Sequence, residues 1–196
     1  MKKLVFATNN AHKLQELRQI VGSKFEIAGL ADIGCHDDIP ETAPTIEGNA
    51  LMKAQWVVDR YGLDCFSDDT GLEIDALGGE PGIYSARYAG NDHNSERNID
   101  KVLHKLQGVP LERRTARFRT AIALIMDGQV HTFEGKVEGL ILTERHGEGG
   151  FGYDSIFKPL EAECTFAQMT PVQKNAISHR GRAVARLIDF LLSLPQ

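Results

Sequence analysis

Two adjacent carboxylates stand in the segment Ser67-Asp68-Asp69-Thr70-Gly71, between the apolar pair Cys65-Phe66 and a strand-like run that begins at Leu72. Like charges repel and each ion resists leaving water, so such a pair is costly unless a cation offsets it. Carboxylate oxygens suit Mg²⁺, which usually takes one or two protein carboxylates and leaves its other positions to water and phosphate. The segment therefore predicts a metal-type site, with an ordinary Asx-turn at a strand end as the local alternative.

A second polar segment, Thr8-Asn9-Asn10-Ala11-His12-Lys13, lies between a predicted strand and a predicted helix. The start of a helix offers backbone N–H groups and the positive end of the helix dipole to an anion. Thr8 and Asn10 add side-chain donors, and Lys13 adds a charge one turn into the helix. The spacing is not that of a Walker P-loop. The segment indicates a phosphate site, and the alternative is a capped helix with an exposed lysine.

A glycine-rich loop, Gly147 to Asp154, places Phe151 and Tyr153 among four glycines. Glycines allow a backbone to approach a flat ligand closely, and an aromatic face can stack on a base. The alternative is a tight turn that Phe151 anchors in the core. Glu41, in a long polar loop, gains meaning only if the fold brings it to Asp69.

Basic residues gather where the last two predicted helices meet, at Lys174 and in Ser178-His179-Arg180-Gly181-Arg182. Donors clustered at a helix start can bind phosphate or a purine carbonyl. The alternative is a serine cap with solvated basic side chains. Taken together, a metal-type site, two anion-type sites and a stacking loop match a nucleoside triphosphate with Mg²⁺.

Composition sets limits on this interpretation. The 196 residues carry a net charge of -5, which argues against a nucleic-acid partner because such proteins need a basic face. The apolar run that follows Met1 stops at Ala7, too early for a secretory signal, and no run approaches membrane-spanning length. The three cysteines form no C-x-x-C pair, and a reducing cytoplasm fits best.

The periodicity predicts the elements that must position these residues. We expect strands at 3–7, 24–28, 72–75, 115–126 and 129–142, with Asp127-Gly128 as a hairpin turn. We expect helices with apolar faces around Leu17, from Thr45 to Gly62, around Val102, after the capping box at Thr170, and around Leu187. A polar loop should span 30–44. The pattern predicts one mixed α/β protein with a partly antiparallel sheet.

The motifs resemble, from end to end, those of the inosine triphosphate pyrophosphatases, also called noncanonical purine NTP or dITP/XTP pyrophosphatases. The matching segments are A-T-x-N-x-x-K at 7–13, S-D-D-T-G-L at 67–72, G-G-x-P-G-I-Y-S-A-R-Y at 78–88, G-G-F-G-Y-D at 149–154 and K-N-x-I-S-H-R-G at 174–181. Departures are small. Asn9 stands where the family commonly has glycine, which bears on the backbone freedom of the phosphate loop, and Thr70 and Ser155 replace common serine and proline.

The resemblance implies a single two-lobed domain over residues 1–196, an elongated mixed sheet flanked by helices with a central cleft, and usually a homodimer. It implies that this chain, with Mg²⁺, converts a purine NTP and water into NMP and pyrophosphate. The implied roles are phosphate binding at Thr8, Asn9, Asn10, Ala11, His12 and Lys13, catalysis at Asp69, metal binding at Glu41, Asp68 and Asp69, and substrate contact at Thr70. Base stacking and orientation fall to Phe151, Gly152, Tyr153 and Asp154, and purine reading to Lys174, His179 and Arg180.

Arg180 suits the 6-keto oxygen, which adenine lacks, so a donor aimed there favours inosine and xanthosine over adenine. Two rival interpretations stand beside this one. Pyrimidine nucleotide pyrophosphatases share a related fold but differ in their motifs. A nucleotide-binding sensor without turnover would not need Lys13 and the pair Asp68-Asp69.

Overall fold

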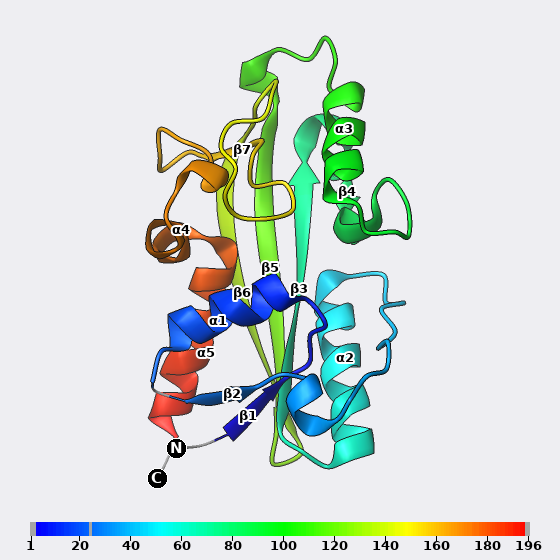
Figure 1. Ribbon diagram of the computed structural model, residues 1–196, viewed down its shortest axis with the longest axis vertical. Coiled ribbons are helices and arrows are strands. Elements are labelled where there is room, and N and C mark those ends of the chain that lie inside the picture. The colour runs from blue at the N-terminus through cyan, green and yellow to red at the C-terminus, as the bar shows by residue number, and fades with distance from the viewer. Residues whose placement is uncertain (1–2, 24, 195–196) are drawn as a thin grey trace. The chain divides into compact units, whose positions relative to one another are not determined.

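The computed structural model describes residues 3–23 and 25–194. Its strands are β1 (Lys3–Phe6), β2 (Glu26–Ala28), β3 (Cys65–Ile74), β4 (Pro81–Gly82), β5 (Thr115–Met126), β6 (Gln129–Ile141) and β7 (Phe157–Pro159). Its α-helices are α1 (Ala11–Val21), α2 (Ile46–Tyr61), α3 (Ser95–Lys105), α4 (Pro171–Ile177) and α5 (His179–Ser193). Figure 1 shows these elements along the chain.

The strands form one mixed sheet in the order β2-β1-β3-β5-β6-β7, with β4 paired to β3. β1 runs parallel to β2 and to β3, whereas β4 runs antiparallel to β3 and β7 antiparallel to β6. The predicted mixed α/β fold with a partly antiparallel sheet is confirmed.

The chain divides into two compact units. Unit 1 comprises residues 1–69, 120–135 and 180–196, and unit 2 comprises residues 70–119 and 136–179. Strands β3, β5 and β6 each give residues to both units. The phosphate-type segment and the paired carboxylates therefore belong to unit 1, and the glycine-rich loop belongs to unit 2.

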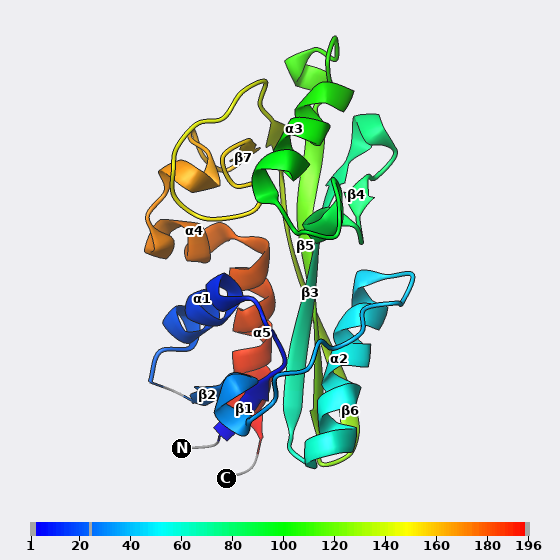
Figure 2. The same ribbon diagram turned by 45° about the vertical axis from the view of Figure 1, so that its right-hand side comes forward.

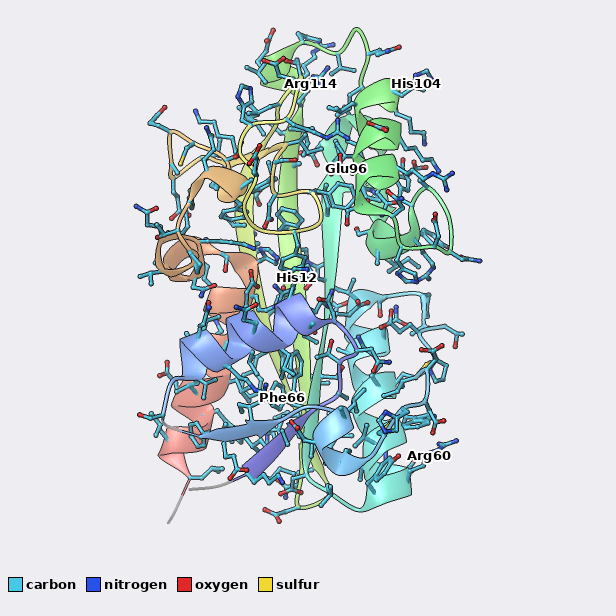
Figure 3. The ribbon with its side chains drawn as sticks, in the orientation of Figure 1. His12, Arg60, Phe66, Glu96, His104 and Arg114 are labelled. Carbon is cyan, nitrogen blue, oxygen red and sulfur yellow. The ribbon has the colours of Figure 1, made fainter. Side chains whose placement is uncertain are left out.

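Unit 1 has helices on both faces of its strands (Figure 2). Alternate residues of β1 point to opposite faces, as a strand requires. Leu4 and Phe6 pack with Leu17 of α1 and Leu187 of α5, while Val5 packs on the other face among residues of α2. Phe66 of β3, labelled in Figure 3, stacks on Phe6 with ring centroids 4.8 Å apart. Both β1 and β3, the strand that carries Asp68, are thus packed on both faces.

Unit 2 has a core of its own on one face of its strands. Leu72 and Ile74 of β3 pack with Phe118 of β5 and with Ile99 and Val102 of α3. The segment that follows β6 adds further buried side chains to this cluster, namely Tyr153, Ile156, Phe157 and Phe166. The core of unit 2 therefore anchors the glycine-rich loop near its C-terminal end, through Tyr153.

Local sequence rules account for most element boundaries. Thr45 caps α2 through a bond from the Gly48 N–H, and Gly62 ends that helix in the left-handed conformation. Asp127 and Gly128 both have positive φ, as a two-residue hairpin turn requires. The capping box at Thr170 is present, with Pro171 at the first helical position. These predictions are confirmed.

Four details differ from expectation. β3 is one strand over Cys65–Ile74, so the Asx-turn alternative at Asp68 is wrong. The 30–44 loop contains a 3₁₀ turn at Ala31–Ile33. β4 and β7 were not predicted, because two or three residues carry too little periodicity. β2 begins at Glu26, and Lys24, where it was expected to begin, lies outside the described residues.

None of the helices within residues 3–23 and 25–194 is long and apolar enough to cross a membrane.

Candidate active site

Asp68 and Asp69 occupy neighbouring positions inside β3, and their carboxylates have different partners. Asp68 bonds to Lys13 of α1 and Arg180 of α5. Asp69 bonds to Asn49 of α2. This division follows from the strand, since successive side chains point to opposite faces of a sheet. The sequence suggests a pair acting side by side, whereas the structure gives each carboxylate an environment of its own.

Asp68 is the centre of a buried ion-pair cluster. Its Oδ1 lies 3.2 Å from Lys13 Nζ and its Oδ2 lies 3.1 Å from Arg180 Nε, with both Asp68 and Arg180 side chains 2% exposed. Burial alone would raise the pKa of Asp68, but Lys13 and Arg180 outweigh it and hold that pKa well below its usual range. Asp68 is therefore ionised at neutral pH and pairs with both cations.

Those two cations respond differently to the same carboxylate. Burial lowers the pKa of Lys13, and the attraction of Asp68 offsets only part of this effect because Lys53 and Arg180 also repel it. Burial would lower the pKa of Arg180 too, but Asp68 and Glu16 together raise it. Arg180 Nη1 also donates to Glu16. Of these two cations, Lys13 is the one whose positive charge is not fully compensated by its neighbours.

The start of α1 is closed by its own side chains. Asn10 Oδ1 accepts from the N–H groups of His12 and Lys13 at 3.0 and 3.2 Å, and Thr8 Oγ1 accepts from Asn10 N at 3.1 Å. The expected open N–H groups of His12 and Lys13 are thus bonded within the segment. His12, labelled in Figure 3, and Ala11 are exposed in this first turn.

The alternative for this segment, a capped helix with an exposed lysine, is only half right. The cap exists, but Lys13 is not an exposed lysine, since its side chain is only 13% exposed and pairs with Asp68. Asn9 stands where the resemblance would place a glycine, yet its backbone is not strained. The described non-glycine residues with positive φ are His93 and Asp127, so Asn9 needs no glycine-type backbone. Its side chain donates to Asp37 O at 3.4 Å.

Asp69 and Glu41 lie in one electrostatic neighbourhood that centres on Lys53. Lys53 Nζ lies 2.8 Å from Glu41 Oε1 and donates to Asp68 O at 2.6 Å. Burial raises the pKa of Asp69, with Lys53 opposing and Glu41 adding to the rise. Burial would also raise the pKa of Glu41, but Lys53 lowers it overall. The fold thus brings Glu41 into the neighbourhood of Asp69, which makes Glu41 a candidate site residue.

The cluster offers carboxylate oxygens, the donor type that a divalent cation prefers. Its four carboxylates, Glu16, Glu41, Asp68 and Asp69, face three cations, Lys13, Lys53 and Arg180, which leaves one net negative charge when all are ionised. In the described part of the chain, no three His, Cys, Asp or Glu side chains could hold a metal by themselves. Mg²⁺ commonly needs only one or two carboxylates beside water and phosphate. Glu41 and Asp69 are the carboxylates best suited.

The glycine-rich loop of unit 2 is held by Asp154. Its Oδ2 accepts from Phe151 N at 3.0 Å and from Lys174 Nζ at 2.7 Å. Gly150 has a φ of +69°, and a Cβ there would lie 2.2 Å from Asp154 Oδ2, so the turn requires glycine. Lys174 Nζ also lies 4.6 Å from the centroid of the Phe151 ring.

The two aromatics of this loop have different surroundings. Tyr153 is buried in the core of unit 2, and its hydroxyl donates to Ser85 O at 2.6 Å. Phe151 is half-buried and lies outside that core cluster, so the alternative of a core anchor applies to Tyr153 instead. Phe151 is the ring better suited to stack on a ligand. Thr70, at the start of unit 2, is also half-buried.

Three of the predicted basic residues at the α4–α5 junction are buried, not solvated, and Arg182 is half-buried. Lys174 and His179 are each 4% exposed and Arg180 is 1% exposed. The His179 ring stacks on Phe118 in unit 2, with centroids 4.6 Å apart. Arg180, in unit 1, has carboxylate partners that the base-reading prediction did not foresee.

Sequence reasoning missed three residues of the unit 1 cluster: Asn49, Lys53 and Glu16. A signal was available for two of them. Asn49 and Lys53 lie among Ala50, Ala54 and Val57 on the buried stripe of α2. Polar residues on a buried stripe need partners, so their position alone marks them for attention.

Fold and site together describe an α/β protein with a buried acid–base cluster beside a helix start and a separate aromatic loop. The chain belongs to the Ham1 family, whose model matches residues 4–190. It is 57% identical over 192 residues to a dITP/XTP pyrophosphatase of Porphyromonas gingivalis, covering 98% of each chain.

Solved structures agree with this membership. The Ham1 protein of Staphylococcus aureus superposes with a TM-score of 0.86 at 39% identity, covering 97% of this chain and 98% of the other. A HAM1 protein from Coxiella burnetii superposes with a TM-score of 0.89 at 35% identity, covering 99% and 100%. The predicted family is thereby confirmed.

Proposed function

We propose that this chain hydrolyses noncanonical purine nucleoside triphosphates, of the ITP, dITP and XTP type, to the monophosphate and pyrophosphate. Such a reaction would remove these nucleotides from the nucleotide pool. The observation that carries the proposal is the buried cluster of Lys13, Lys53, Asp68 and Asp69 in a member of the Ham1 family. Relatives that match nearly the whole chain carry the name dITP/XTP pyrophosphatase.

In this proposal, the residues of unit 1 act on the triphosphate. Lys13 receives the phosphates, since an added anion offsets the burial that lowers its pKa. Asp69 acts as the carboxylate that orients water, and its raised pKa suits a group that accepts a proton. Asp68 holds Lys13 in place. Mg²⁺ bound at Glu41 and Asp69 would supply charge neutralisation and polarisation of the phosphates.

The residues of unit 2 act on the nucleoside. Phe151 offers stacking, which every base can accept, at about 1–3 kcal/mol. Asp154 and Lys174 hold the backbone of that loop through the contacts described above. We propose that Thr70, Lys174 and His179 contact the substrate. We also propose that Arg180, which belongs to unit 1, reads the 6-keto oxygen.

Arg180 has two possible roles. It can read the base of the substrate, or it can serve only to hold Asp68 through their ion pair. If it reads the base, Arg180→Lys should reduce the ratio of kcat/KM for ITP to that for ATP. If it only holds Asp68, both nucleotides should lose the same factor. Glu16→Gln is the matched control, since it removes the other carboxylate partner of Arg180.

We also propose a cytoplasmic homodimer. Cys35, Cys65 and Cys164 are free thiols, which suits a reducing compartment. Size-exclusion chromatography with light scattering decides the oligomeric state, and a mass of about 43 kDa supports the dimer, twice the 21.6 kDa of one chain.

The experiment for the function is a panel of ITP, dITP, XTP, GTP, ATP and dTTP, assayed for pyrophosphate with and without Mg²⁺. We expect release from the first three nucleotides, little from GTP and ATP, and dependence on the metal. A preference for dTTP would favour the pyrimidine enzymes. Tight ITP binding without pyrophosphate release would favour a sensor.

A further inference from the structure

Two side chains one turn apart on α2 tie the same loop to the same strand. Lys53 joins Glu41 of the 30–44 loop to the backbone of Asp68 in β3. Asn49 does the same four residues earlier. Its Oδ1 accepts from Ala43 N at 2.9 Å, and its Nδ2 donates to Asp69 Oδ2 at 3.2 Å. The helix thus holds the loop and the strand together at two levels.

The orientation of the Asn49 amide follows from its partners. A backbone N–H only donates, so the atom that faces Ala43 N must be the amide oxygen. The amide nitrogen then faces Asp69, whose ionised carboxylate only accepts. The side chain has no exposed surface, so both bonds form away from water and neither is readily replaced by solvent. The Asn49 amide therefore has one orientation that satisfies both Ala43 and Asp69.

The loop is also pressed against the helix at this point. A Cβ on Gly48 would lie 2.8 Å from the Cβ of Ala43, so the close approach depends on glycine. Ala43 is two residues from Glu41 along the chain, so the Glu41 backbone must lie within about 7 Å of it. The Asn49 contact therefore restrains where Glu41 lies.

We propose that Asn49 is a positioning residue that fixes Glu41 and Asp69 relative to each other and so prepares the carboxylates for a divalent cation. This inference rests on the proposed function, since it takes Asp69 and Glu41 as the metal-binding carboxylates. Hydrogen-bond partners that orient metal ligands commonly change metal affinity or activity by about 10- to 100-fold when removed. Asn49 itself touches neither water nor substrate in this account.

Asn98 provides a matched control in unit 2. It is 3% exposed and also bridges backbone segments, with Oδ1 accepting from Ala89 N at 2.7 Å and Nδ2 donating to Ala86 O at 3.1 Å. It has no carboxylate partner among these contacts. A purely structural asparagine should therefore behave like Asn98, and a positioning asparagine should not.

The experiment compares Asn49→Ala and Asn98→Ala by three readouts: hydrogen exchange of the Ala43 amide without metal, Mn²⁺ binding without nucleotide by electron paramagnetic resonance, and kcat and KM for ITP at saturating Mg²⁺. For Asn49→Ala we expect loss of amide protection, a Mn²⁺ dissociation constant at least about tenfold higher, and a lower kcat with KM changed less than threefold. Asn98→Ala should lose thermal stability but keep the wild-type dissociation constant for Mn²⁺. Asn49→Ser, which keeps one polar group, replaces Asn49→Ala if that variant does not fold.

Wild-type Mn²⁺ affinity and kcat in a folded Asn49 variant would overturn the inference, as would an equal loss of Mn²⁺ affinity in Asn98→Ala. The wild-type protein separates this failure from that of the proposed function. If the wild type neither binds Mn²⁺ nor releases pyrophosphate from ITP, the proposed function fails. If it does both and Asn49→Ala matches it, only the positioning role fails.

Discussion

Replacing Asp68 by asparagine keeps the shape of the side chain and removes a charge that two buried cations share. Lys13 and Arg180 lie 3.2 and 3.1 Å from its two oxygens. Removing one partner of a buried ion pair costs about 3–5 kcal/mol because an uncompensated charge remains. Arg180 keeps Glu16, and Lys13 already has a lowered pKa that eases loss of its proton. We therefore expect a loss near the lower limit, about 3 kcal/mol.

The assay is urea unfolding in metal-free buffer, followed by the fluorescence of Trp56. This residue is the chain's single tryptophan and lies on α2, in the same unit as Asp68. With an m-value of about 2 kcal/mol/M, the midpoint should fall by roughly 1.5 M. Asp32→Asn is the control, since it breaks an ion pair to Arg18 whose side chains are about half exposed. Exposed pairs contribute little, so this midpoint should barely move.

The pH dependence gives an independent check with a definite sign. The pKa of Asp68 is lower in the folded protein than in an unfolded chain, so its contribution is complete above the ordinary aspartate pKa of about 3.9. It is lost as the pH falls toward the folded value. The part of the stability difference that comes from the titration of Asp68 itself should stay constant above about pH 5 and narrow below about pH 4. An Asp68→Asn variant as stable as wild type at pH 7 would refute the buried ion pair.

Two further predictions concern packing in other places. Gly150→Ala should lower the thermal midpoint of unfolding several degrees more than Gly152→Ala, because both have positive φ but only a Cβ on Gly150 meets Asp154; equal midpoints would contradict the loop geometry. Burial raises the pKa of Cys65 to about 12, so alkylation of the folded protein at pH 8 should modify the half-buried Cys164 first and leave Cys65 unmodified until unfolding. Peptide mass spectrometry reads the order, and early modification of Cys65 would contradict its burial.

Local chemistry made much of the fold predictable. The hairpin at Asp127-Gly128, the cap at Thr45 and the capping box at Thr170 each depend on residues within a few positions of one another. Short-range rules describe such features well because the partners are neighbours in sequence. Strands of two or three residues carry no comparable signal and depend on a longer partner strand, as β4 depends on β3 and β7 on β6.

The environment of Asp68 shows where sequence reasoning ends. Two adjacent aspartates look like an exposed turn or a metal pair, because a buried carboxylate needs cations. Here those cations are Lys13 and Arg180, which lie 55 and 112 positions away in the chain. No local pattern shows that they meet, so the continuity of β3 and the ion-paired state of Arg180 required the structure.

We expect hydrolysis by this protein to release pyrophosphate and to depend on Asp69. The most direct measurement is separation of the products that wild type and Asp69→Asn form from XTP with Mg²⁺. We expect wild type to give equal amounts of XMP and pyrophosphate, and Asp69→Asn to stay folded while its turnover falls by orders of magnitude. Production of XDP and phosphate by wild type would rule out the proposed reaction, and near-normal turnover in Asp69→Asn would rule out the role of Asp69.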